Sequence, residues 1–357
     1  MRLTHLHCRA FRCLDEIDLA PAPGLNVIRG NNAQGKTSIL EAIYYAATAR
    51  SHRTNADPEL VEYGKEAFHV TMRAQRRDRE ATIEASWWKG AKRFKLNGVA
   101  QLRLSDILGK INVVLFTPED LELIKGGAAE RRRYLDVELS QLSPAYLAAL
   151  QSYRHALRQR NELLRKGNPD DAQMDVWDKQ LAAHGELVIA ERAAGISELS
   201  GYARDSYENI ARHEPMSLAY DPNVVPGERF DEVLRKARQT DIRRGMTTHG
   251  PHRDDIKILV GGHPARSHAS QGQQKSAALA MKLAGLELIH RRTGEYPILM
   301  LDEVLSELDD DRAARLFTGI DESVQCIVTT TELDGRRQPF TRDATEFRIS
   351  QGRIENS

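Results

Sequence analysis

Residues 30–37 read Gly30-Asn31-Asn32-Ala33-Gln34-Gly35-Lys36-Thr37, a match to G-x-x-x-x-G-K-[ST], the pattern of phosphate-binding loops. The glycines let the backbone curl so that successive N–H groups point at anionic oxygens. Lys36 would place a positive charge on the β- and γ-phosphates, and the Thr37 hydroxyl suits Mg²⁺, which prefers oxygen ligands. The whole run is therefore predicted to bind ATP, with Thr37 also on the metal.

The flanking residues favour this interpretation over an ordinary glycine turn. Leu25-Asn26-Val27-Ile28 before the loop is typical of a short buried strand, and residues 38–45 after it are typical of a helix. The N-terminus of such a helix attracts phosphate. Strand, loop and helix in this order form the context in which the motif binds nucleotide.

A second group of candidate residues lies near the other end of the chain. Residues 297–301 are apolar, and two carboxylates, Asp302 and Glu303, follow them directly. Such a run fits a strand buried on both faces of a parallel sheet, whose carboxyl end faces the ligand crevice. In this Walker B pattern, Asp302 is predicted to hold Mg²⁺ and Glu303 to orient or deprotonate the attacking water. The alternative, two solvated surface acids, is disfavoured by the phosphate-binding loop.

Two further motifs carry a resemblance. They are Ala269-Ser270-Gln271-Gly272-Gln273-Gln274, which a helical run follows, and Ser306-Glu307-Leu308-Asp309. With them the chain resembles the ATP-binding-cassette ATPases, whose signature loop closes over the ATP of a second subunit. The resemblance implies a homodimer with two ATP molecules between its heads. It also implies that Ser270, Gly272 and Gln273 contact the nucleotide, and that Ser270 acts in catalysis with Lys36 and Glu303.

A long insertion precedes the signature motif, whereas transporter cassettes are compact. A head that is split by an insertion resembles the SMC and recombination-repair branch of these ATPases. Within that branch the chain closely resembles the RecF family of bacterial repair ATPases. The matching segments are residues 1–12, 30–37, 50–53, 116–120, 126–136 and 248–255. The resemblance implies an α/β fold: an ATP-binding-cassette, SMC-like head, with a phosphate-loop mixed sheet and an antiparallel β subdomain, plus an inserted short helical arm.

The same resemblance implies a function. A protein of this kind is expected to close as an ATP-dependent homodimer on duplex, gapped or junction DNA and to reopen on slow, DNA-stimulated ATP hydrolysis. ATP and Mg²⁺ are the implied cofactors. RecR, with RecO, is the implied partner in loading RecA at single-strand gaps, and replication restart and the SOS response are the processes served.

The pattern along the chain predicts three segments: head residues 1–118, a helical arm over 119–246, and head residues 247–357. Asn97-Gly98 signals a hairpin in the first segment. In the second, Ser143-Pro144 marks a helix start. The arm is too short for a long coiled coil. The third segment carries the signature and Walker B motifs.

Composition narrows the class of protein. The chain has 51 basic and 51 acidic residues, so a DNA site must be a local basic face. Contacts with DNA are predicted at Arg50, Arg53, Arg131 and Arg132, against the alternative of solvated faces. Three cysteines without metal-ligand spacing suit a reducing cytoplasm. No signal peptide and no apolar run of roughly 20 residues is visible, which argues against a membrane protein.

Two departures from the cassette pattern bear on hydrolysis. Residues 116–120 contain no glutamine where transporter cassettes carry a glutamine loop, and residues 326–331 offer threonines where those cassettes carry a histidine. Threonine can bond a phosphate oxygen but carries no positive charge, so slow hydrolysis is expected. Two rival functions stay open: a transport cassette working with separate membrane subunits, and a defence ATPase with a nuclease site. The latter needs a further carboxylate cluster for two metals, which the sequence does not show.

Overall fold

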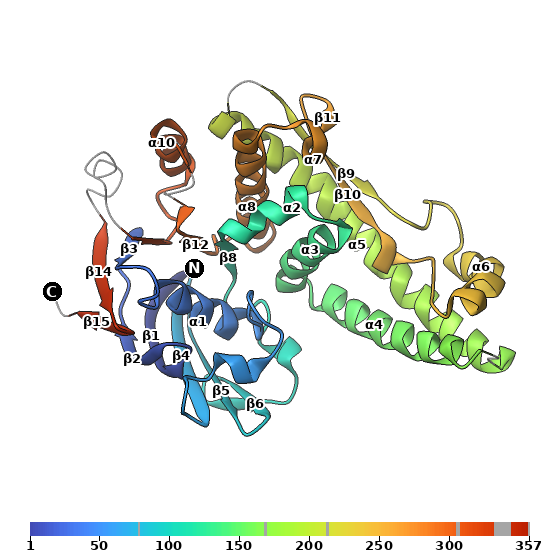
Figure 1. Cartoon of the computed structure of the whole chain (residues 1–357), viewed down its shortest axis with the longest axis horizontal. Helices are drawn as coiled ribbons and strands as arrows, with labels where there is room; N and C mark the ends of the chain where they lie inside the picture. Colours follow the sequence, from blue (N-terminus) through green and yellow to red (C-terminus); the bar gives the residue numbers. More distant parts are fainter. Residues whose placement is uncertain (78, 168–169, 212–213, 305–307, 332–343, 356–357) are drawn as a thin grey trace. The chain divides into compact units, whose positions relative to one another are not determined.

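The computed structural model describes residues 1–77, 79–167, 170–211, 214–304, 308–331 and 344–355 (Figure 1). The chain forms two compact units. Unit 1 comprises Met1–Asp120, Asp205–His213 and Ala278–Ser357, and unit 2 comprises Leu121–Arg204 and Glu214–Ala277. Across the described part of the chain, no helix is both long and apolar enough to span a bilayer.

The motif-bearing sheet of unit 1 has the strand order β15-β14-β3-β13-β12-β8. All neighbours in it are parallel except β15, which runs antiparallel to β14. Three of its strands are buried along their whole length, as expected for strands covered on both faces. The bounds are β3 (Leu25–Arg29), β8 (Val113–Phe116), β12 (Ile298–Asp302), β13 (Cys326–Thr330), β14 (Thr345–Ser350) and β15 (Arg353–Glu355). The strands predicted before the loop and before Asp302 are confirmed.

The second sheet of unit 1 is antiparallel, in the order β2-β1-β4-β5-β6-β7. The predicted hairpin turn joins β6 to β7, with φ of 49° at Asn97 and 79° at Gly98. Helix α1 (Lys36–Thr48) contacts strands of both sheets, and Ile39, Ile43 and Tyr45 from it lie in one core with residues of both. The strands are β1 (Arg2–Phe11), β2 (Leu14–Leu19), β4 (Ala67–Arg76), β5 (Arg79–Trp88), β6 (Ala91–Leu96) and β7 (Val99–Gln101).

Unit 2 is mainly helical, as predicted for the arm. Its helices are α2 (Glu122–Lys125), α3 (Ala128–Leu142), α4 (Pro144–Arg165), most of α5 (Asp171–Ala211), α6 (Phe230–Arg244), α7 (Ala265–His268) and the start of α8 (Gln271–Thr293). Helix α4 begins as predicted, because Ser143 Oγ accepts from the Tyr146 N–H (3.1 Å) and Pro144 takes the first helical position. Helix α10 (Asp310–Gly319) lies in unit 1, and the 3₁₀ turns among the described residues are Asp57–Leu60, Leu104–Asp106, Pro118–Leu121 and Pro251–Arg253.

Apart from the short stretch Asp205–His213, the chain returns to unit 1 only at Ala278, whereas the sequence pattern predicted a return at residue 247. The reason is strand pairing. β10 (Asp255–Val260) pairs antiparallel with β9 (Met216–Asp221) and with β11 (His263–Pro264), so this three-stranded sheet belongs to unit 2. The segment that carries Ser270 is therefore part of unit 2.

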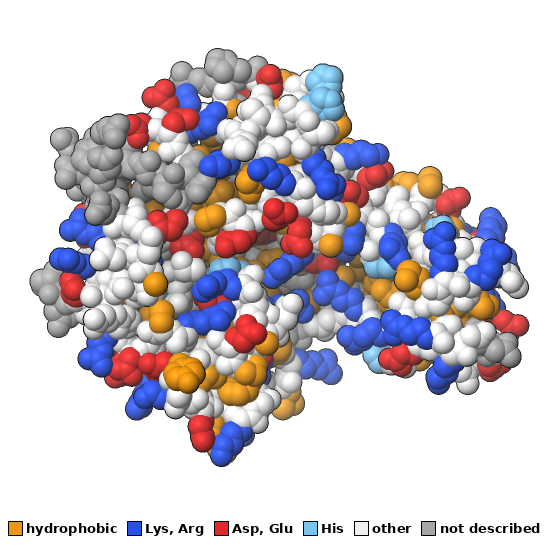
Figure 2. All heavy atoms as spheres, in the orientation of Figure 1, with side chains coloured by type: hydrophobic (Ala, Val, Ile, Leu, Met, Phe, Trp, Pro, Cys, Tyr) orange, Lys and Arg blue, Asp and Glu red, His pale blue; other side chains and the backbone are white. Residues whose placement is uncertain are grey.

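Basic and acidic side chains are mixed over the visible surface (Figure 2). On the face of unit 2 seen there, Lys and Arg side chains are spread over the helices with acidic side chains between them. This mixing agrees with the balanced charge of the chain.

Candidate nucleotide-binding site

The phosphate-binding loop joins β3 to α1 and lies wholly in unit 1. Its two motif glycines are required by the space around them. A Cβ on Gly30 would lie 2.3 Å from the Ile349 carbonyl oxygen, and one on Gly35 would lie 2.7 Å from Leu14 Cδ2. Gly35 also has φ of 109°, a conformation that side chains other than glycine rarely adopt. The sequence therefore forms a tight loop that leads directly into a helix N-terminus.

Lys36 is held over this loop. Its Nζ donates to the carbonyl oxygens of Gly30 (2.8 Å) and Asn31 (3.1 Å) and lies 3.0 Å from Glu303 Oε1. The Lys36 side chain is only 5% exposed, whereas that of Glu303 is 23% exposed. The structure thus brings together the lysine and the glutamate that the sequence analysis assigned to one reaction centre.

Asp302 lies at the end of β12, close to Thr37. The Thr37 hydroxyl donates to Asp302 Oδ1 at 3.1 Å, and Asp302 is 4% exposed. Burial raises the pKa of Asp302; hydrogen bonds from Thr329 and Thr37 oppose that rise, while the charges of Glu303 and Glu119 add to it. A buried carboxylate beside a hydroxyl offers oxygen donors that need a cation, so Thr37 and Asp302 fit Mg²⁺.

Thr329 belongs to this centre, although the sequence analysis considered the threonines of residues 326–331 only for a bond to a phosphate oxygen and not for contacts with the two acids. Its hydroxyl donates to Asp302 Oδ1 (2.5 Å) and accepts from the Glu303 N–H (3.0 Å). The only signal in the sequence was a threonine run on the strand after Walker B. Its meaning depends on the sheet order, which places β13 between β3 and β12.

A second set of contacts missed by the sequence analysis surrounds Glu41, which is fully buried on α1. Arg12 binds it with two hydrogen bonds (2.9 and 2.7 Å), and the Ser51 hydroxyl donates to it at 2.5 Å. Burial would raise the pKa of Glu41, but these hydrogen bonds outweigh it and hold the pKa below its ordinary value. Arg53, a predicted DNA contact, lies 3.3 Å from Glu41 and is 46% exposed, and Arg50 is exposed.

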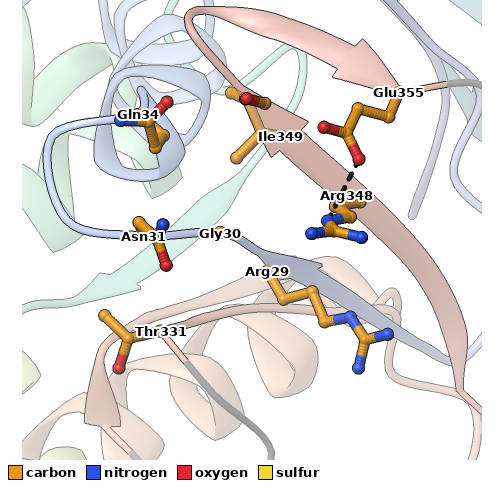
Figure 3. Close-up of a pocket in the computed structure, with 9 residues that line it drawn as sticks. Arg29, Gly30, Asn31, Gln34, Thr331, Arg348, Ile349 and Glu355 are labelled. Atoms are coloured by element: carbon orange, nitrogen blue, oxygen red, sulfur yellow. Dashed lines mark ion pairs between the residues drawn. The ribbon is translucent and has the colours of Figure 1, made fainter.

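A polar cavity of about 340 Å³ lies beside the loop at the carboxyl ends of β3 and β14 (Figure 3). Gln34 anchors the loop to the β14–β15 turn on this side. Its Oε1 accepts from the Gln351 N–H (2.6 Å), and its carbonyl oxygen accepts from the Gly352 N–H (3.1 Å). Arg348 in the cavity wall pairs with Glu355 at 3.0 Å. The outer face of the loop is therefore fixed by the C-terminal strands.

The signature motif forms the N-terminus of α8 in unit 2. The Ser270 N–H donates to Gln273 Oε1 (2.6 Å), and the Gln273 N–H donates to Ser270 Oγ (3.3 Å), which is a capping box. Gln273 Nε2 also donates to Glu214 Oε2 at 2.7 Å. Ser270 is exposed and Gly272 is half-buried. The predicted Ser306 and Glu307 lie outside the described residues, and Asp309 caps α10 through the Arg312 N–H.

Two of the predicted DNA contacts turn inward in unit 2. Arg131 is 7% exposed, binds both carboxylate oxygens of Asp255 (2.7 and 2.9 Å) and donates to the Leu123 and Gly126 carbonyl oxygens. This placement does not fit the predicted contact with DNA at Arg131, because the guanidinium is already satisfied within the unit. Arg132 is half-buried and donates to the Asp254 carbonyl oxygen at 2.6 Å.

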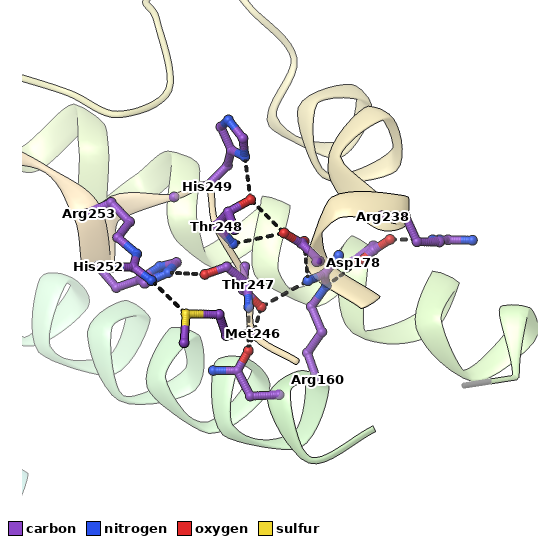
Figure 4. Close-up of polar contacts among 12 residues, drawn as sticks. Arg160, Asp178, Arg238, Met246, Thr247, Thr248, His249, His252 and Arg253 are labelled. Atoms are coloured by element: carbon purple, nitrogen blue, oxygen red, sulfur yellow. Dashed lines mark hydrogen bonds and ion pairs between the residues drawn. The ribbon is translucent and has the colours of Figure 1, made fainter. Parts of the chain in front are cut away.

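The segment 248–255, which also carried the resemblance, has a packing role in the same unit (Figure 4). His252 Nε2 donates to the Thr247 carbonyl oxygen (3.0 Å), which leaves Nδ1 to accept from the Tyr153 hydroxyl (2.6 Å). Nearby, the fully buried Arg160 bonds to Asp178 (2.6 Å) and Asp241 (2.7 Å). These contacts connect α4, α5 and α6 to the segment that precedes β10.

Comparisons with known proteins agree with this geometry. The family model described as the RecF/RecN/SMC N terminal domain matches residues 2–341. Proteins described as "DNA replication and repair protein RecF" from Bacillus mycoides (strain KBAB4) and Geobacillus kaustophilus (strain HTA426) are each 39% identical to this chain. The matches cover 99% of this chain and 98% and 99% of those proteins.

Solved structures give the same result. The recombination mediator protein RecF with ATP, described as part of the RecFOR pathway, has a TM-score of 0.90 and 32% identity, over 99% of this chain and 97% of that one. The Smc head domain of Pyrococcus furiosus has a TM-score of 0.59 at 17% identity, over 99% of this chain and 95% of that one, which indicates a shared fold. The expected SMC-like, ATP-binding-cassette head fold is confirmed.

Proposed function

Because the chain belongs to the RecF family of DNA replication and repair proteins, we propose that it is an ATP-dependent DNA-binding protein of recombinational repair. The observation that carries this proposal is the convergence of Lys36, Thr37, Asp302 and Glu303 in unit 1. A phosphate loop alone would support nucleotide binding. The adjoining carboxylates add the chemistry of hydrolysis.

Each residue has a distinct part in this proposal. The loop N–H groups and the start of α1 bind the phosphates, and Lys36 moves its charge from Glu303 to the β- and γ-phosphates. Thr37 and Asp302 would hold Mg²⁺, which when bound neutralises charge on the phosphates. Glu303 orients the attacking water and accepts its proton.

The signature motif completes the site across a homodimer. Ser270 is exposed at the N-terminus of α8, where its hydroxyl and the N–H groups of the first turn attract an anion. We propose that the anion bound there is the γ-phosphate of an ATP molecule held by a second subunit. ATP then contacts both subunits only in the closed dimer, so it shifts the population toward closure, and hydrolysis reopens the dimer.

The closed dimer would act on duplex, gapped or junction DNA in the cytoplasm. Arg50, Arg53 and Arg132 stay candidates for contacts with the DNA backbone, since none of them is fully buried. The relatives' role in the RecFOR pathway supports RecR, with RecO, as the partner and RecA loading at gaps as the outcome. Replication restart and the SOS response are the processes that such loading serves.

DNA retention tests the proposal. Fluorescence anisotropy of gapped, duplex and single-stranded DNA would be measured with and without ATP for the parent and for Lys36→Ala. We expect ATP to strengthen binding to the duplex-containing DNAs for the parent and not for Lys36→Ala, with circular dichroism unchanged. A Lys36→Ala protein that binds ATP and DNA as the parent does would refute the site.

A further inference from the structure

We propose that Thr329 is a positioning residue for hydrolysis, which holds the Asp302 carboxylate and the backbone of Glu303 in one arrangement. The inference rests on the proposed roles of those two acids. It assigns a function to the threonine-rich strand after Walker B, where transporter cassettes carry a histidine.

The sheet order places Thr329 at the centre of the site. β13 lies between the phosphate-loop strand β3 and the Walker B strand β12. Thr329 is the register partner of Asp302 on one side and of Ile28 on the other. It is 0% exposed, so its contacts are made with the protein and not with bulk water. The side chain at this position therefore meets Asp302 directly.

One hydroxyl contacts both acids. A threonine hydroxyl has one proton to donate and can also accept, and here it donates to Asp302 Oδ1 at 2.5 Å and accepts from the Glu303 N–H at 3.0 Å. The Thr37 hydroxyl donates to the same oxygen, Oδ1, at 3.1 Å. Two donors on one oxygen fix the rotation of the Asp302 carboxylate. Ligand carboxylates that are oriented in this way hold metal ions more tightly.

The second contact supports an uncommon backbone conformation. Glu303 has φ of 52°, in the left-handed region that residues other than glycine seldom occupy. Such conformations persist where surrounding contacts hold them. The bond from its N–H to Thr329 is one such contact, and in this conformation the Glu303 carboxylate lies 3.0 Å from Lys36 Nζ. Thr329 thereby holds the backbone from which the side chain of the proposed base, Glu303, extends.

The test compares Thr329→Val, Thr329→Ser and Glu303→Gln in the full chain. Valine keeps the shape and removes the hydroxyl, while serine keeps the hydroxyl. A fluorescent ATP analogue is titrated in EDTA and at increasing Mg²⁺, and turnover is measured at saturating Mg²⁺ and ATP. We expect Thr329→Val to bind the analogue in EDTA as the parent does. In this variant the Mg²⁺ concentration for half-maximal tightening should rise, and turnover should fall, each by roughly 10–100-fold.

Thr329→Ser should keep both properties near those of the parent, because it retains the hydroxyl. A purely steric role predicts the opposite order, since valine keeps the shape of threonine and serine does not. Thr329→Ala is a second hydroxyl-free variant, which replaces Thr329→Val if thermal melts show that the valine protein is unfolded. Parental Mg²⁺ dependence and turnover in the folded hydroxyl-free variants, with Glu303→Gln inactive, overturn the inference and leave the proposed site intact. A serine variant as impaired as the valine variant also overturns it. Parental turnover in Glu303→Gln contradicts the proposed site itself.

Discussion

Two acids that adjoin in the sequence are given different tasks by their surroundings. Asp302 is buried, and two threonine hydroxyls bond to one of its oxygens, so its carboxylate is fixed and short of solvent. Glu303 is partly exposed and lies against the Lys36 ammonium. A fixed buried carboxylate suits a cation, and a more accessible one suits proton transfer.

Glu303→Gln should therefore separate ATP binding from hydrolysis. Glutamine keeps the size of the side chain but cannot accept a proton, and losing the carboxylate frees Lys36 for the phosphates. We expect ATP to bind at least as well as to the parent while turnover falls by about 10²–10⁴-fold. Single-turnover assays with labelled ATP measure both quantities, and normal turnover would show that Glu303 is not the base.

The buried His252 predicts an acid-sensitive unit 2. Burial lowers the pKa of His252 to about 4, with Arg253 and Arg132 also lowering it and the Thr247 carbonyl and Asp241 opposing. The unfolded chain, with an ordinary pKa of 6.5, binds a proton first. The stabilising contribution is thus complete above pH 6.5 and is lost as the pH falls toward 4, by roughly 3 kcal/mol.

Urea unfolding between pH 4 and 7 measures this contribution as the difference between the parent and His252→Gln. The glutamine variant should be less stable near pH 7 and should lose less stability on acidification. Substitution of the exposed His263 by glutamine is the control and should leave the pH dependence unchanged. Equal slopes for the parent and His252→Gln would contradict the assignment of a neutral imidazole.

At the scale of elements, helix α3 shows how a basic run can be divided between two roles. Three consecutive arginines follow its first three residues, and of these Arg131 is buried on Asp255 and Arg133 is exposed. Helical geometry turns successive side chains to different faces. The first arginine therefore ties α3 to the start of β10, and the third faces outward.

Arg131→Gln should destabilise unit 2 and leave DNA binding unaltered where the protein stays folded. Removing one partner of a buried ion pair costs roughly 3–5 kcal/mol; we expect less here because the Asp255 side chain is 34% exposed. Arg133→Gln is the matched control and should change stability little. Urea unfolding and the salt dependence of DNA affinity are the measurements. Parental stability with a shallower salt slope would restore Arg131 as a phosphate contact.

How well each element was predicted depends on whether its evidence is local. The strands and helix around the phosphate loop, the Asn97-Gly98 hairpin and the Ser143 cap were predictable because short segments carry their own signals. The pairing of β10 with β9, which places β10 in unit 2, was not predicted because it joins two segments that are distant in the sequence. The contacts of Thr329 and the Arg131–Asp255 pair were missed because a short stretch of sequence reveals neither the order of strands in a sheet nor the partner of a side chain far along the chain.

At the scale of the whole molecule, the nucleotide residues are divided between the two units. The phosphate loop and the Walker B acids belong to unit 1, and the signature residues Ser270, Gly272 and Gln273 belong to unit 2. Helices α5 and α8 contribute residues to both units. The proposal that ATP closes a dimer requires the signature turn of one subunit to meet the loop of another.

Sedimentation velocity of Ser270→Arg with ATP tests that requirement most directly. A bulky cation at the start of α8 blocks the closing contact without touching the phosphate loop of its own chain. We expect Ser270→Arg to bind ATP and stay monomeric, while Glu303→Gln accumulates as a dimer. Mixing Ser270→Arg with Lys36→Ala should recover a partial dimer, because one of its two sites is then complete. Full dimer formation by Ser270→Arg alone would contradict the composite site.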